Sequence, residues 1–310
     1  MKKAIVTGAN GFVGTALLNE LSERGVEIYA VVMNEQENIS AIQDIPGVHI
    51  LYSDMAHLAE LAGKLPKGVD AFFHLAWAGS SGSARADTAL QLQNVQWTVD
   101  AVRLAAAVEC NRFVGAGTLA ELDVLAYSPL PGSTPNTVAN YGVAKFAAHC
   151  MSKAECNKLG VAHLWPYLSN TYGIGNYTSN FINFASKTML THQPANFTPG
   201  VQPYDFVYIS DIVHGLYCIG NKGKENETYY IGSNAPRQLK EFVIELRDMI
   251  DPEIELNLGA VPFNGVAHDM SVFDCTKLIR DTGYQPKVSF SDGIKKTVKW
   301  IDEQLKEGKL

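Results

Sequence analysis

Long apolar runs and an excess of basic residues are both missing from this 310-residue chain. No uninterrupted apolar stretch approaches the roughly 20 residues that a membrane-spanning helix needs. Lys and Arg number 25 against 32 Asp and Glu, which gives a formal net charge of -7. Proteins that bind nucleic acid usually gather Lys and Arg in clusters, and no such cluster stands out here. We therefore expect neither a membrane span nor a nucleic-acid partner.

Cysteine pairs and metal-ligand spacings are missing as well. The five cysteines, at positions 110, 150, 156, 218 and 275, are odd in number and include no Cys-x-x-Cys spacing. This pattern is typical of free thiols in a reducing compartment, so it predicts a cytoplasmic protein. The eight histidines show no metal-ligand spacing, and we expect no metal site.

What the first half of the chain does contain is an alternation of short apolar runs with longer helical patterns. Strands are expected over 4–6, 27–32, 48–52, 71–75, 112–115 and 162–165. Helices are expected over 13–24, 89–108 and 140–159, the last one ended by Gly160 as a C-terminal cap. The alternation predicts the α/β class with a doubly wound parallel sheet, the Rossmann arrangement, in which ligands bind beyond the carboxyl ends of the strands.

The regular alternation fades after about residue 172. Later segments at 206–209 and 228–231 resemble strands, and those at 239–250 and 291–306 resemble helices. We expect a dinucleotide-binding Rossmann domain over 1–171, to which the chain returns around 201–232. A smaller C-terminal α/β lobe, over 172–200 and 233–310, is expected to bind the substrate.

The stretch TGANGFVG, which begins at Thr7, joins the first expected strand to the first expected helix. Glycines at 8, 11 and 14 let a ligand approach the backbone closely, and the helix N-terminus offers free N–H groups and a partial positive charge. This arrangement predicts a pyrophosphate site for a dinucleotide. The alternative is a glycine-rich turn without a ligand. A nucleoside-triphosphate P-loop is excluded, because no Lys-Ser or Lys-Thr follows Gly14.

Tyr141 and Lys145 stand four residues apart on an expected helix, so their side chains share one face. A phenol with an ordinary pKa near 10 is a poor base at neutral pH. A nearby ammonium group, an oxidised nicotinamide and the positive end of a helix would all favour the phenolate. Without other motifs, such a pair is more often an exposed helix face.

Several motifs in order make the chain resemble the extended short-chain dehydrogenase/reductase family, in its branch of NAD(P)-dependent nucleotide-sugar epimerases and dehydratases. The resemblance covers nearly the whole chain. Its motifs are TGANGFVG from Thr7, FHLAWAG from Phe73, NVQWT from Asn94, YGVAK from Tyr141, SNTYG from Ser169 and YDFVYISDIV from Tyr204.

The resemblance implies a catalytic group of Thr118, Tyr141 and Lys145. Tyr141 would be the acid/base, Thr118 would hydrogen-bond the reacting sugar oxygen, and Lys145 would also hold the nicotinamide ribose. Taken alone, Thr118 would more simply cap a turn. Besides Tyr141 and Lys145, the implied cofactor contacts are Gly8, Asn10, Gly11, Phe12, Val13, Gly14, Asn34, Asp54, Met55, Leu75, Ala76, Asn94 and Leu168. The implied substrate contacts are Asn170, Asn180 and Tyr204.

Three residues near these positions allow a second interpretation. Asp54 is implied to contact the adenine, but it is equally suited to capping a turn or helix. His74 lies within the strand motif and is expected to be structural rather than catalytic. Trp77 follows that strand and is expected to pack against the nicotinamide, the substrate or the core.

Residues that the family usually carries are missing at three places. Relatives that dehydrate the sugar have an Asp-Glu pair directly after the catalytic Thr, whereas Leu119 and Ala120 stand here, so 4,6-dehydration is disfavoured. Glu121 is one residue displaced, and in a strand-like segment its side chain would turn to the other face. Arginines that grip the substrate phosphate are replaced by Tyr167 and Tyr204. The diphosphate would then need Arg237, Lys187 or backbone amides.

The carboxylate that binds the adenine ribose in NAD-preferring relatives is also missing. Its position, at the end of the second expected strand, is occupied by Val32. Met33 follows, where NADP-preferring relatives often have Arg. Loss of the carboxylate removes the repulsion against a 2′-phosphate, so between NAD and NADP the pattern favours NADP.

Four functions remain open from the sequence. The preferred ones are hydride transfer at C4 of a nucleoside-diphosphate sugar, either as an epimerase with tightly held NAD or as a 4-keto-sugar reductase with exchangeable NADPH. The others are a reductase of a non-nucleotide carbonyl compound and a dinucleotide-binding sensor without turnover. A homodimer is expected, because the helices at 89–108 and 140–159 carry Ala-rich apolar faces. Those faces could also pack only within the monomer.

Overall fold

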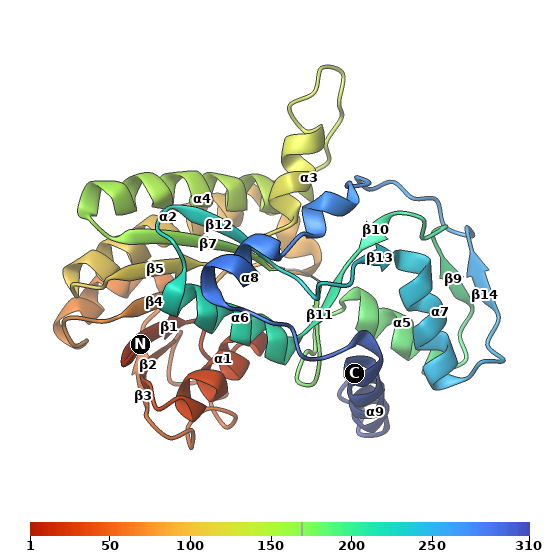
Figure 1. Cartoon of the computed structure of the whole chain (residues 1–310), viewed down its shortest axis with the longest axis horizontal. Helices are drawn as coiled ribbons and strands as arrows, with labels where there is room; N and C mark the ends of the chain where they lie inside the picture. Colours follow the sequence, from red (N-terminus) through yellow and green to blue (C-terminus); the bar gives the residue numbers. More distant parts are fainter. Residues whose placement is uncertain (169) are drawn as a thin grey trace. The chain divides into compact units, whose positions relative to one another are not determined.

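The computed structural model describes residues 1–168 and 170–310 and divides into two compact units (Figure 1). Unit 1 consists of Met1–Leu168, Val213–Ile231 and Lys277–Gln285. Unit 2 consists of Ser169–Ile212, Gly232–Thr276 and Pro286–Leu310. No helix within 1–168 and 170–310 is long and apolar enough to cross a membrane. The five cysteines are all free thiols.

Unit 1 is built on one parallel sheet, which confirms the predicted fold class. Its strands are β1 (Lys3–Thr7), β2 (Glu27–Val32), β3 (Val48–Tyr52), β4 (Ala71–His74), β5 (Arg112–Gly115), β6 (Gly117–Thr118), β7 (Ala162–Leu168) and β12 (Glu227–Ile231). They follow the order β12-β7-β5-β4-β1-β2-β3, and β6 pairs with β7. The chain runs outward from β1 to β3 and then resumes at β4 on the other side of β1. The gap between β1 and β4 is therefore the topological switch point, where such sheets bind ligands.

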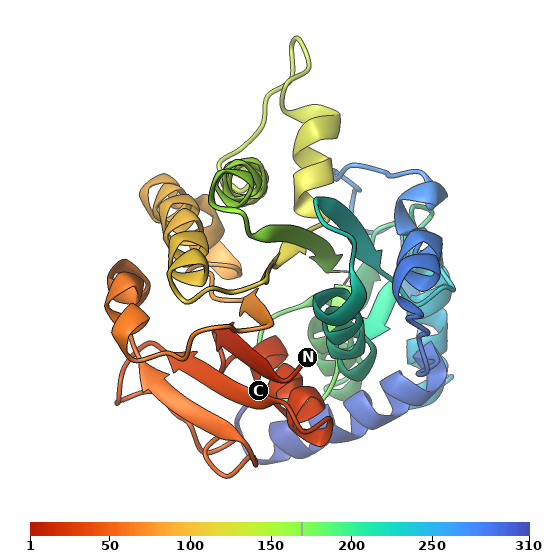
Figure 2. The ribbon, with the colours of Figure 1, turned by 60° about the vertical axis from the view of Figure 1, so that its left-hand side comes forward.

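Helices cover both faces of this sheet. The helices that contribute to unit 1 are α1 (Phe12–Glu23), α2 (Thr88–Ala107), α3 (Ala120–Tyr127), α4 (Ala139–Leu159), α6 (Ile209–Lys222) and α8 (Thr276–Thr282), with the 3-10 helices η1 (Met55–Gly63) and η2 (Gly82–Ala86). Figure 2 shows α2 and α4 on one face and α1 and α6 on the other. An Arg103–Glu155 ion pair links α2 to α4, and Arg24 lies 3.9 Å from the Tyr217 ring centroid between α1 and α6.

The local sequence explains these elements. The strand residues Ala4, Ile5 and Val6 are completely buried, as expected for a strand covered on both faces. The predicted helix stop at Gly160 is present: this residue caps α4 with a left-handed φ of 72°. Gly115 and Gly117 lie against the ring of Trp165, so a side chain at either position would collide with it.

Unit 2 contains three longer helices and three small strand pairs. The helices are α5 (Phe181–Leu190), α7 (Leu239–Ile250) and α9 (Phe290–Lys306), and the 3-10 helix η3 spans Met270–Phe273. The strand pairs are β8 (Asn170–Tyr172) with β11 (Phe206–Tyr208), β9 (Ala195–Phe197) with β14 (Leu256–Leu258), and β10 (Pro203–Tyr204) with β13 (Arg237–Gln238). Its core is aromatic, with the Phe242 and Phe290 ring centroids 4.8 Å apart and Phe206 within 5.8 Å of both.

The sequence places the return of the chain to the main sheet around 201–232. In the structure, the returning segments are 213–231 and 277–285. The difference arises because β10 and β11 pair with strands of unit 2, so the chain re-enters unit 1 only within α6. The second return is held by α8, where Asp281 pairs with Lys224 at 2.8 Å.

Candidate active site and dinucleotide site

The glycine turn follows β1 directly at the switch point of the sheet. Gly8 has a φ of 68°, and a Cβ there would lie 2.8 Å from the backbone N of Ala76, in the loop after β4. A Cβ on Gly14 would lie 2.1 Å from the carbonyl oxygen of Gly8. Only glycine fits at both positions, because α1, the turn and the loop after β4 approach one another at backbone distance.

The N-terminus of α1 opens from this turn. Gly11 is its N-cap and offers no side-chain hydrogen bond. The first N–H groups of a helix have no partner within the helix, and those of Phe12 and Val13 are among them. A cap without a side chain leaves them for an anion. The cradle that only glycine can form and the uncapped helix end both fit the pyrophosphate of a dinucleotide.

The loop after β4 is fixed to this turn and to α2. Leu75 donates its backbone N–H to the carbonyl oxygen of Thr7 at 3.3 Å. The buried Asn94 side chain accepts from the N–H of Ala78 and donates to its carbonyl oxygen, each at 2.9 Å. Asn94 therefore positions the loop that carries Leu75 and Ala76.

The end of β2 lies beside the same turn. The backbone N of Ala9 contacts the carbonyl oxygen of Val31 at 3.5 Å. Asn10 donates its side-chain N–H to the Glu37 carboxylate at 3.2 Å. The side chain of Asn34 accepts from the N–H of Gln36 at 3.0 Å and so closes the turn that presents Glu37. Sequence reasoning did not identify Glu37, which belongs to no motif.

Asp54 caps η1. Its carboxylate accepts the N–H groups of Ala56 and His57 at 2.9 and 3.0 Å and pairs with the His57 ring at 2.7 Å. The hydrogen bond from His57 lowers the pKa of Asp54. These contacts match the capping role that the sequence left open. Met55 packs against the apolar core of unit 1.

The three implied catalytic residues come together from two elements of unit 1. Thr118 lies in β6, next to Leu168 of β7, while Tyr141 and Lys145 lie in α4. The Thr118 hydroxyl acts on the Tyr141 phenol, whose pKa it lowers. Lys145 is buried and donates to the carbonyl oxygen of Ala116 at 2.7 Å. A hydroxyl, a phenol and an amine thus lie at the carboxyl end of the sheet.

The cation beside the phenol is Arg85 of η2. Its guanidinium carbon lies 4.3 Å from the centroid of the Tyr141 ring. Burial raises the pKa of Tyr141, and the positive charge of Arg85 and the Thr118 hydroxyl oppose that rise. The sequence assigns this electrostatic role to Lys145. Burial instead lowers the pKa of Lys145 to about 7. Arg85 was missed because no spacing connects residues 85 and 141.

Arg85 also carries a buried Nε atom with no hydrogen-bond partner among the described residues. Trp77 completes the group: its ring centroid lies 3.8 Å from Lys145 Nζ and 6.1 Å from the Tyr141 ring centroid. Trp77 therefore packs against both α4 residues.

His74 is held inside the sheet. Its Nδ1 is hydrogen-bonded to the Thr7 hydroxyl at 3.0 Å, and its Nε2 lies 3.4 Å from the Thr98 hydroxyl. Burial lowers the pKa of His74 to about 3, so the ring is neutral at physiological pH. These contacts agree with the structural role expected from the sequence.

Glu121 departs from the expectation of a strand-like segment. The residues after Thr118 form α3, and Glu121 lies in its first turn, fully buried. Its carboxylate accepts the N–H of Thr118 and the indole N–H of Trp165, both at 3.0 Å, and contacts the His149 ring at 3.2 Å. Glu121 therefore points inward and positions the backbone of Thr118.

The implied substrate residues all lie in unit 2. Asn170 donates to the carbonyl oxygen of Asp205 at 3.1 Å. Asn180 caps α5 by accepting the N–H of Asn183 at 2.9 Å, and its side-chain nitrogen is buried with no hydrogen-bond partner among the described residues. The first residue of the SNTYG motif, Ser169, lies outside the described residues.

Tyr204, where relatives carry Arg, lies opposite Arg237 in the antiparallel pair of β10 and β13. Arg237 forms an ion pair with Glu245, and its guanidinium carbon lies 4.2 Å from the Phe242 ring centroid. These side chains line part of a pocket of about 250 Å³. Lys187, the other candidate, is exposed on α5.

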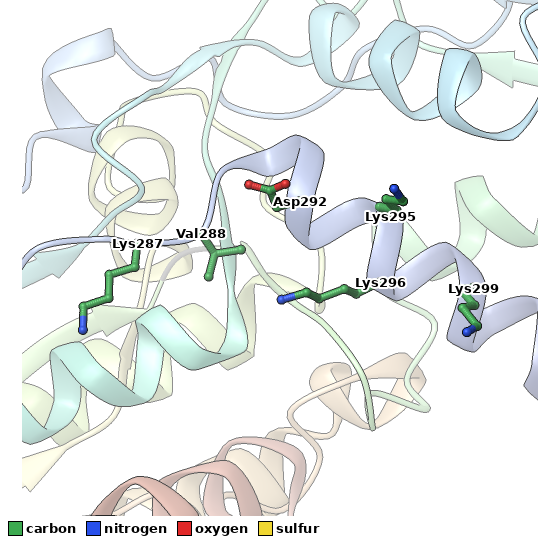
Figure 3. Close-up of a pocket in the computed structure, with 6 residues that line it drawn as sticks. All are labelled: Lys287, Val288, Asp292, Lys295, Lys296 and Lys299. Carbon is green, nitrogen blue, oxygen red and sulfur yellow. The ribbon is translucent and has the colours of Figure 1, made fainter.

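Four lysines surround a further pocket of unit 2, with a volume of about 430 Å³ (Figure 3). Lys295, Lys296 and Lys299 come from α9, and Lys287 precedes it, together with Val288. Asp292 supplies the one carboxylate in the lining that the structure describes. Lys295, Lys296 and Lys299 are close in the sequence, and the fold adds Lys287, which precedes Lys295 by eight residues.

The chain matches the family model described as the NAD dependent epimerase/dehydratase family over residues 4–232. It is similar to a dTDP-glucose 4,6-dehydratase of Haemophilus influenzae, with 23% identity over 97% of this chain and 98% of that protein.

The chain also shares its fold with solved structures. The Bordetella bronchiseptica enzyme WbmF in complex with NADH has a TM-score of 0.80 at 20% identity, covering 99% of this chain and 93% of that one. A UDP-glucose 4-epimerase of Thermotoga maritima, solved with UDP-glucose, has a TM-score of 0.80 at 19% identity, covering 98% and 99%.

Proposed function

Since this chain belongs to the NAD dependent epimerase/dehydratase family, we propose that it transfers hydride at C4 of a nucleoside-diphosphate sugar, as a 4-epimerase or a 4-keto-sugar reductase. The observation that carries this proposal is the surroundings of the Tyr141 phenol, whose ring centroid lies 4.3 Å from the Arg85 guanidinium carbon and 6.1 Å from the Trp77 ring centroid. The Thr118 hydroxyl and Arg85 both lower the pKa of this phenol, which suits it to moving a proton at a sugar oxygen.

The dinucleotide would be held by the turn at Gly8, Gly11 and Gly14 and by the first N–H groups of α1. When bound, it supplies the hydride acceptor and donor. Lys145, buried next to Trp77, would hold the nicotinamide ribose.

The proton chemistry belongs to Tyr141. Its phenolate oxygen would accept the proton of the C4 hydroxyl during oxidation and return it during reduction. The Thr118 hydroxyl, positioned by Glu121, would hydrogen-bond the same sugar oxygen. The positive charge of Arg85 favours the phenolate form that this step needs.

Unit 2 would bind the nucleotide part. The unpartnered side-chain nitrogen of Asn180, at the N-terminus of α5, is a free donor for a diphosphate oxygen. Tyr204 and Asn170 would add neutral hydrogen bonds. The names of similar proteins support this substrate class, because they include a dTDP-glucose dehydratase and a UDP-glucose epimerase.

Dehydration is the less favoured outcome, although curated relatives are named for it. Leu119 and Ala120, which follow Thr118, cannot move a proton. The carboxylate of Glu121 is buried and engaged with Thr118, Trp165 and His149. No acid/base pair for elimination across C5 and C6 is therefore offered by the residues after Thr118.

The test is turnover of a panel of sugars linked to UDP, dTDP, GDP and CDP with NAD present, and of the corresponding 4-keto sugars with NADH or NADPH, with the C4 configuration read by NMR. We expect C4 inversion or 4-keto reduction with at least one sugar, and no 4-keto-6-deoxy product from dTDP-glucose. Tightly retained NAD in the purified protein would indicate an epimerase, and an exchangeable cofactor a reductase.

The matched variant is Tyr141→Phe, which keeps the ring that packs against Arg85 and Trp77. We expect it to lose about 100-fold or more of kcat, as general acid–base catalysts do, while thermal stabilisation by the nucleoside diphosphate is unchanged. Absence of stabilisation by all four diphosphates would contradict the proposed substrate class.

A further inference from the structure

The carboxylate expected at the end of β2 is absent, but the structure brings another one to the glycine turn. Val32 occupies the strand-end position and is buried, while the next residue, Met33, is 55% exposed. Five residues beyond Val32, the Glu37 carboxylate accepts a hydrogen bond from Asn10 at 3.2 Å. Asn10 lies between Gly8 and Gly11, so Glu37 is tied to the pyrophosphate turn itself.

The backbone fixes this position from two sides. Ala9 of the turn contacts the Val31 carbonyl oxygen at 3.5 Å, which holds the turn against the end of β2. Beyond the strand, the Glu37 N–H donates to the Asn34 carbonyl oxygen at 3.3 Å, and the Asn34 side chain accepts from Gln36. Glu37 is half-buried, unlike Glu35 and Gln36, which are exposed.

The chain segment that contains Glu37 carries formal charge of one sign. No Lys or Arg occurs between Gly25 and Gly63, whereas the same stretch contains six carboxylates. A 2′-phosphate would bring a charge of about -1.5 to -2 to this region and find no cation there. A ribose with free 2′- and 3′-hydroxyls can instead donate hydrogen bonds to a carboxylate.

We propose that Glu37 binds the adenine-ribose hydroxyls in place of the missing strand-end carboxylate and makes the site select NAD over NADP. This inference rests on the proposed function, because it places a dinucleotide on the glycine turn. It reverses the preference for NADP drawn from the sequence, which considered only positions 32 and 33. Asn10 and Asn34 are positioning residues for the Glu37 carboxylate.

The experiment measures the dissociation constants of NAD and NADP by calorimetry, on protein stripped of bound nucleotide. Wild type is expected to bind NAD about 100-fold more tightly than NADP, a ratio of the size that a charge-assisted hydrogen bond and a repelled phosphate produce. Glu37→Gln keeps the length of the side chain and removes its charge. This variant is expected to bind NAD about 10-fold more weakly than wild type and to bind NADP more tightly than wild type. Glu37→Arg is expected to favour NADP.

Glu35→Gln is the matched control, because it removes one negative charge from the same turn at an exposed position. It is expected to leave the NAD to NADP ratio within about twofold of wild type. Circular dichroism and the thermal midpoint establish that each variant is folded.

The possible failures are distinguishable. The role of Glu37 is overturned if wild type binds NAD and NADP equally well. It is also overturned if Glu37→Gln has the same ratio of NAD to NADP affinity as wild type. Either result leaves the proposed enzyme intact. If Glu35→Gln changes the NAD to NADP ratio as much as Glu37→Gln does, general surface charge sets the preference. That result also overturns the role of Glu37. Wild type that binds neither dinucleotide would overturn the proposed function together with this assignment.

Discussion

Arg85 is the residue whose chemistry is least expected from the chain alone. Its guanidinium carbon lies 4.3 Å from the Tyr141 ring centroid, and its buried Nε has no hydrogen-bond partner within the described residues. Leaving such a donor unsatisfied costs free energy. A cation in this position also stabilises the phenolate relative to the phenol. We therefore propose that Arg85 supports the acid/base function proposed for Tyr141.

Replacing Arg85 is predicted to move the pH profile upward. The base form of Tyr141 is the deprotonated one, so loss of the neighbouring positive charge raises its pKa and reduces the active fraction at neutral pH. For Arg85→Gln we expect the acidic limb of kcat/KM to shift up by about one pH unit, with roughly tenfold lower activity at pH 7. Arg85→Lys keeps the positive charge and is expected to retain most of the wild-type activity at pH 7.

The control for that profile is Arg103→Gln, which removes an arginine from α2 that pairs with Asp100 and Glu155. It should leave the acidic limb in place. A profile of Arg85→Gln that falls uniformly, without a shift in pH, would mean that Arg85 only supports packing.

At this scale, the sequence predicted the residues that local spacing connects and missed those that the fold connects. Tyr141 and Lys145 are four apart, and helix geometry alone puts them on one face. Arg85 and Glu37 reach Tyr141 and Asn10 over 56 and 27 residues, distances that no periodicity encodes. Glu121 was misjudged because its direction depends on whether the segment after Thr118 is a strand or a helix.

The turn between β1 and α1 leaves no room for a side chain at Gly14. A Cβ on Gly14 would lie 2.1 Å from the Gly8 carbonyl oxygen and 2.8 Å from that of Ala9. Both atoms are backbone, so they cannot move without shifting α1 or the turn. The same close approach that shapes the proposed pyrophosphate site therefore constrains the first helix.

Gly14→Ala is predicted to destabilise the fold and to weaken dinucleotide binding together. Overpacking of this kind costs about 1–3 kcal/mol of unfolding free energy, measured by urea denaturation, and displaced N–H groups should raise the Kd for NAD. Gly63→Ala is the matched control, because a Cβ there meets nothing within 4 Å. Normal NAD affinity in a folded Gly14→Ala variant would contradict the position assigned to the pyrophosphate.

Physical reasons explain which helices and strands the sequence predicted and which it missed. Strands buried on both faces and the long helices α1, α2 and α4 were found, because their apolar patterns are continuous or periodic. The helices α3, α5, α6 and α8 were not predicted. α6 begins at Ile209, directly after β11, and the isoleucines in its first turn resemble a continuation of that strand in the sequence. α3 spans only Ala120–Tyr127, too short for a clear period.

At the scale of the whole molecule, α2 and α4 leave large apolar side chains in solvent. Leu92 on α2 is 63% exposed, and on α4 Val143 is 45% and Met151 52% exposed. Val143 and Met151 are eight residues apart and so share one face of the helix. We propose that these side chains meet a second copy of the chain in a homodimer.

We predict that the wild-type protein is a dimer in size-exclusion chromatography with light scattering. The double substitution Val143→Glu and Met151→Glu is expected to convert it to a monomer. Burying two carboxylates against apolar surface is unfavourable without partners. Val261→Glu, at a position 41% exposed outside these helices, should remain dimeric. A monomeric wild-type protein would show that the exposed side chains serve another purpose.

The chain returns to unit 1 twice, and these returns determine when unit 1 can complete its folding during synthesis. During synthesis, the ribosome releases β1 to β7 long before β12, and α8 emerges later still, after most of unit 2. The growing chain must therefore keep an unfinished sheet edge at β7 until residue 231 has appeared. For the same reason, no single cut in the gene yields either unit intact, and a truncation at the end of β7 would leave that edge open to aggregation.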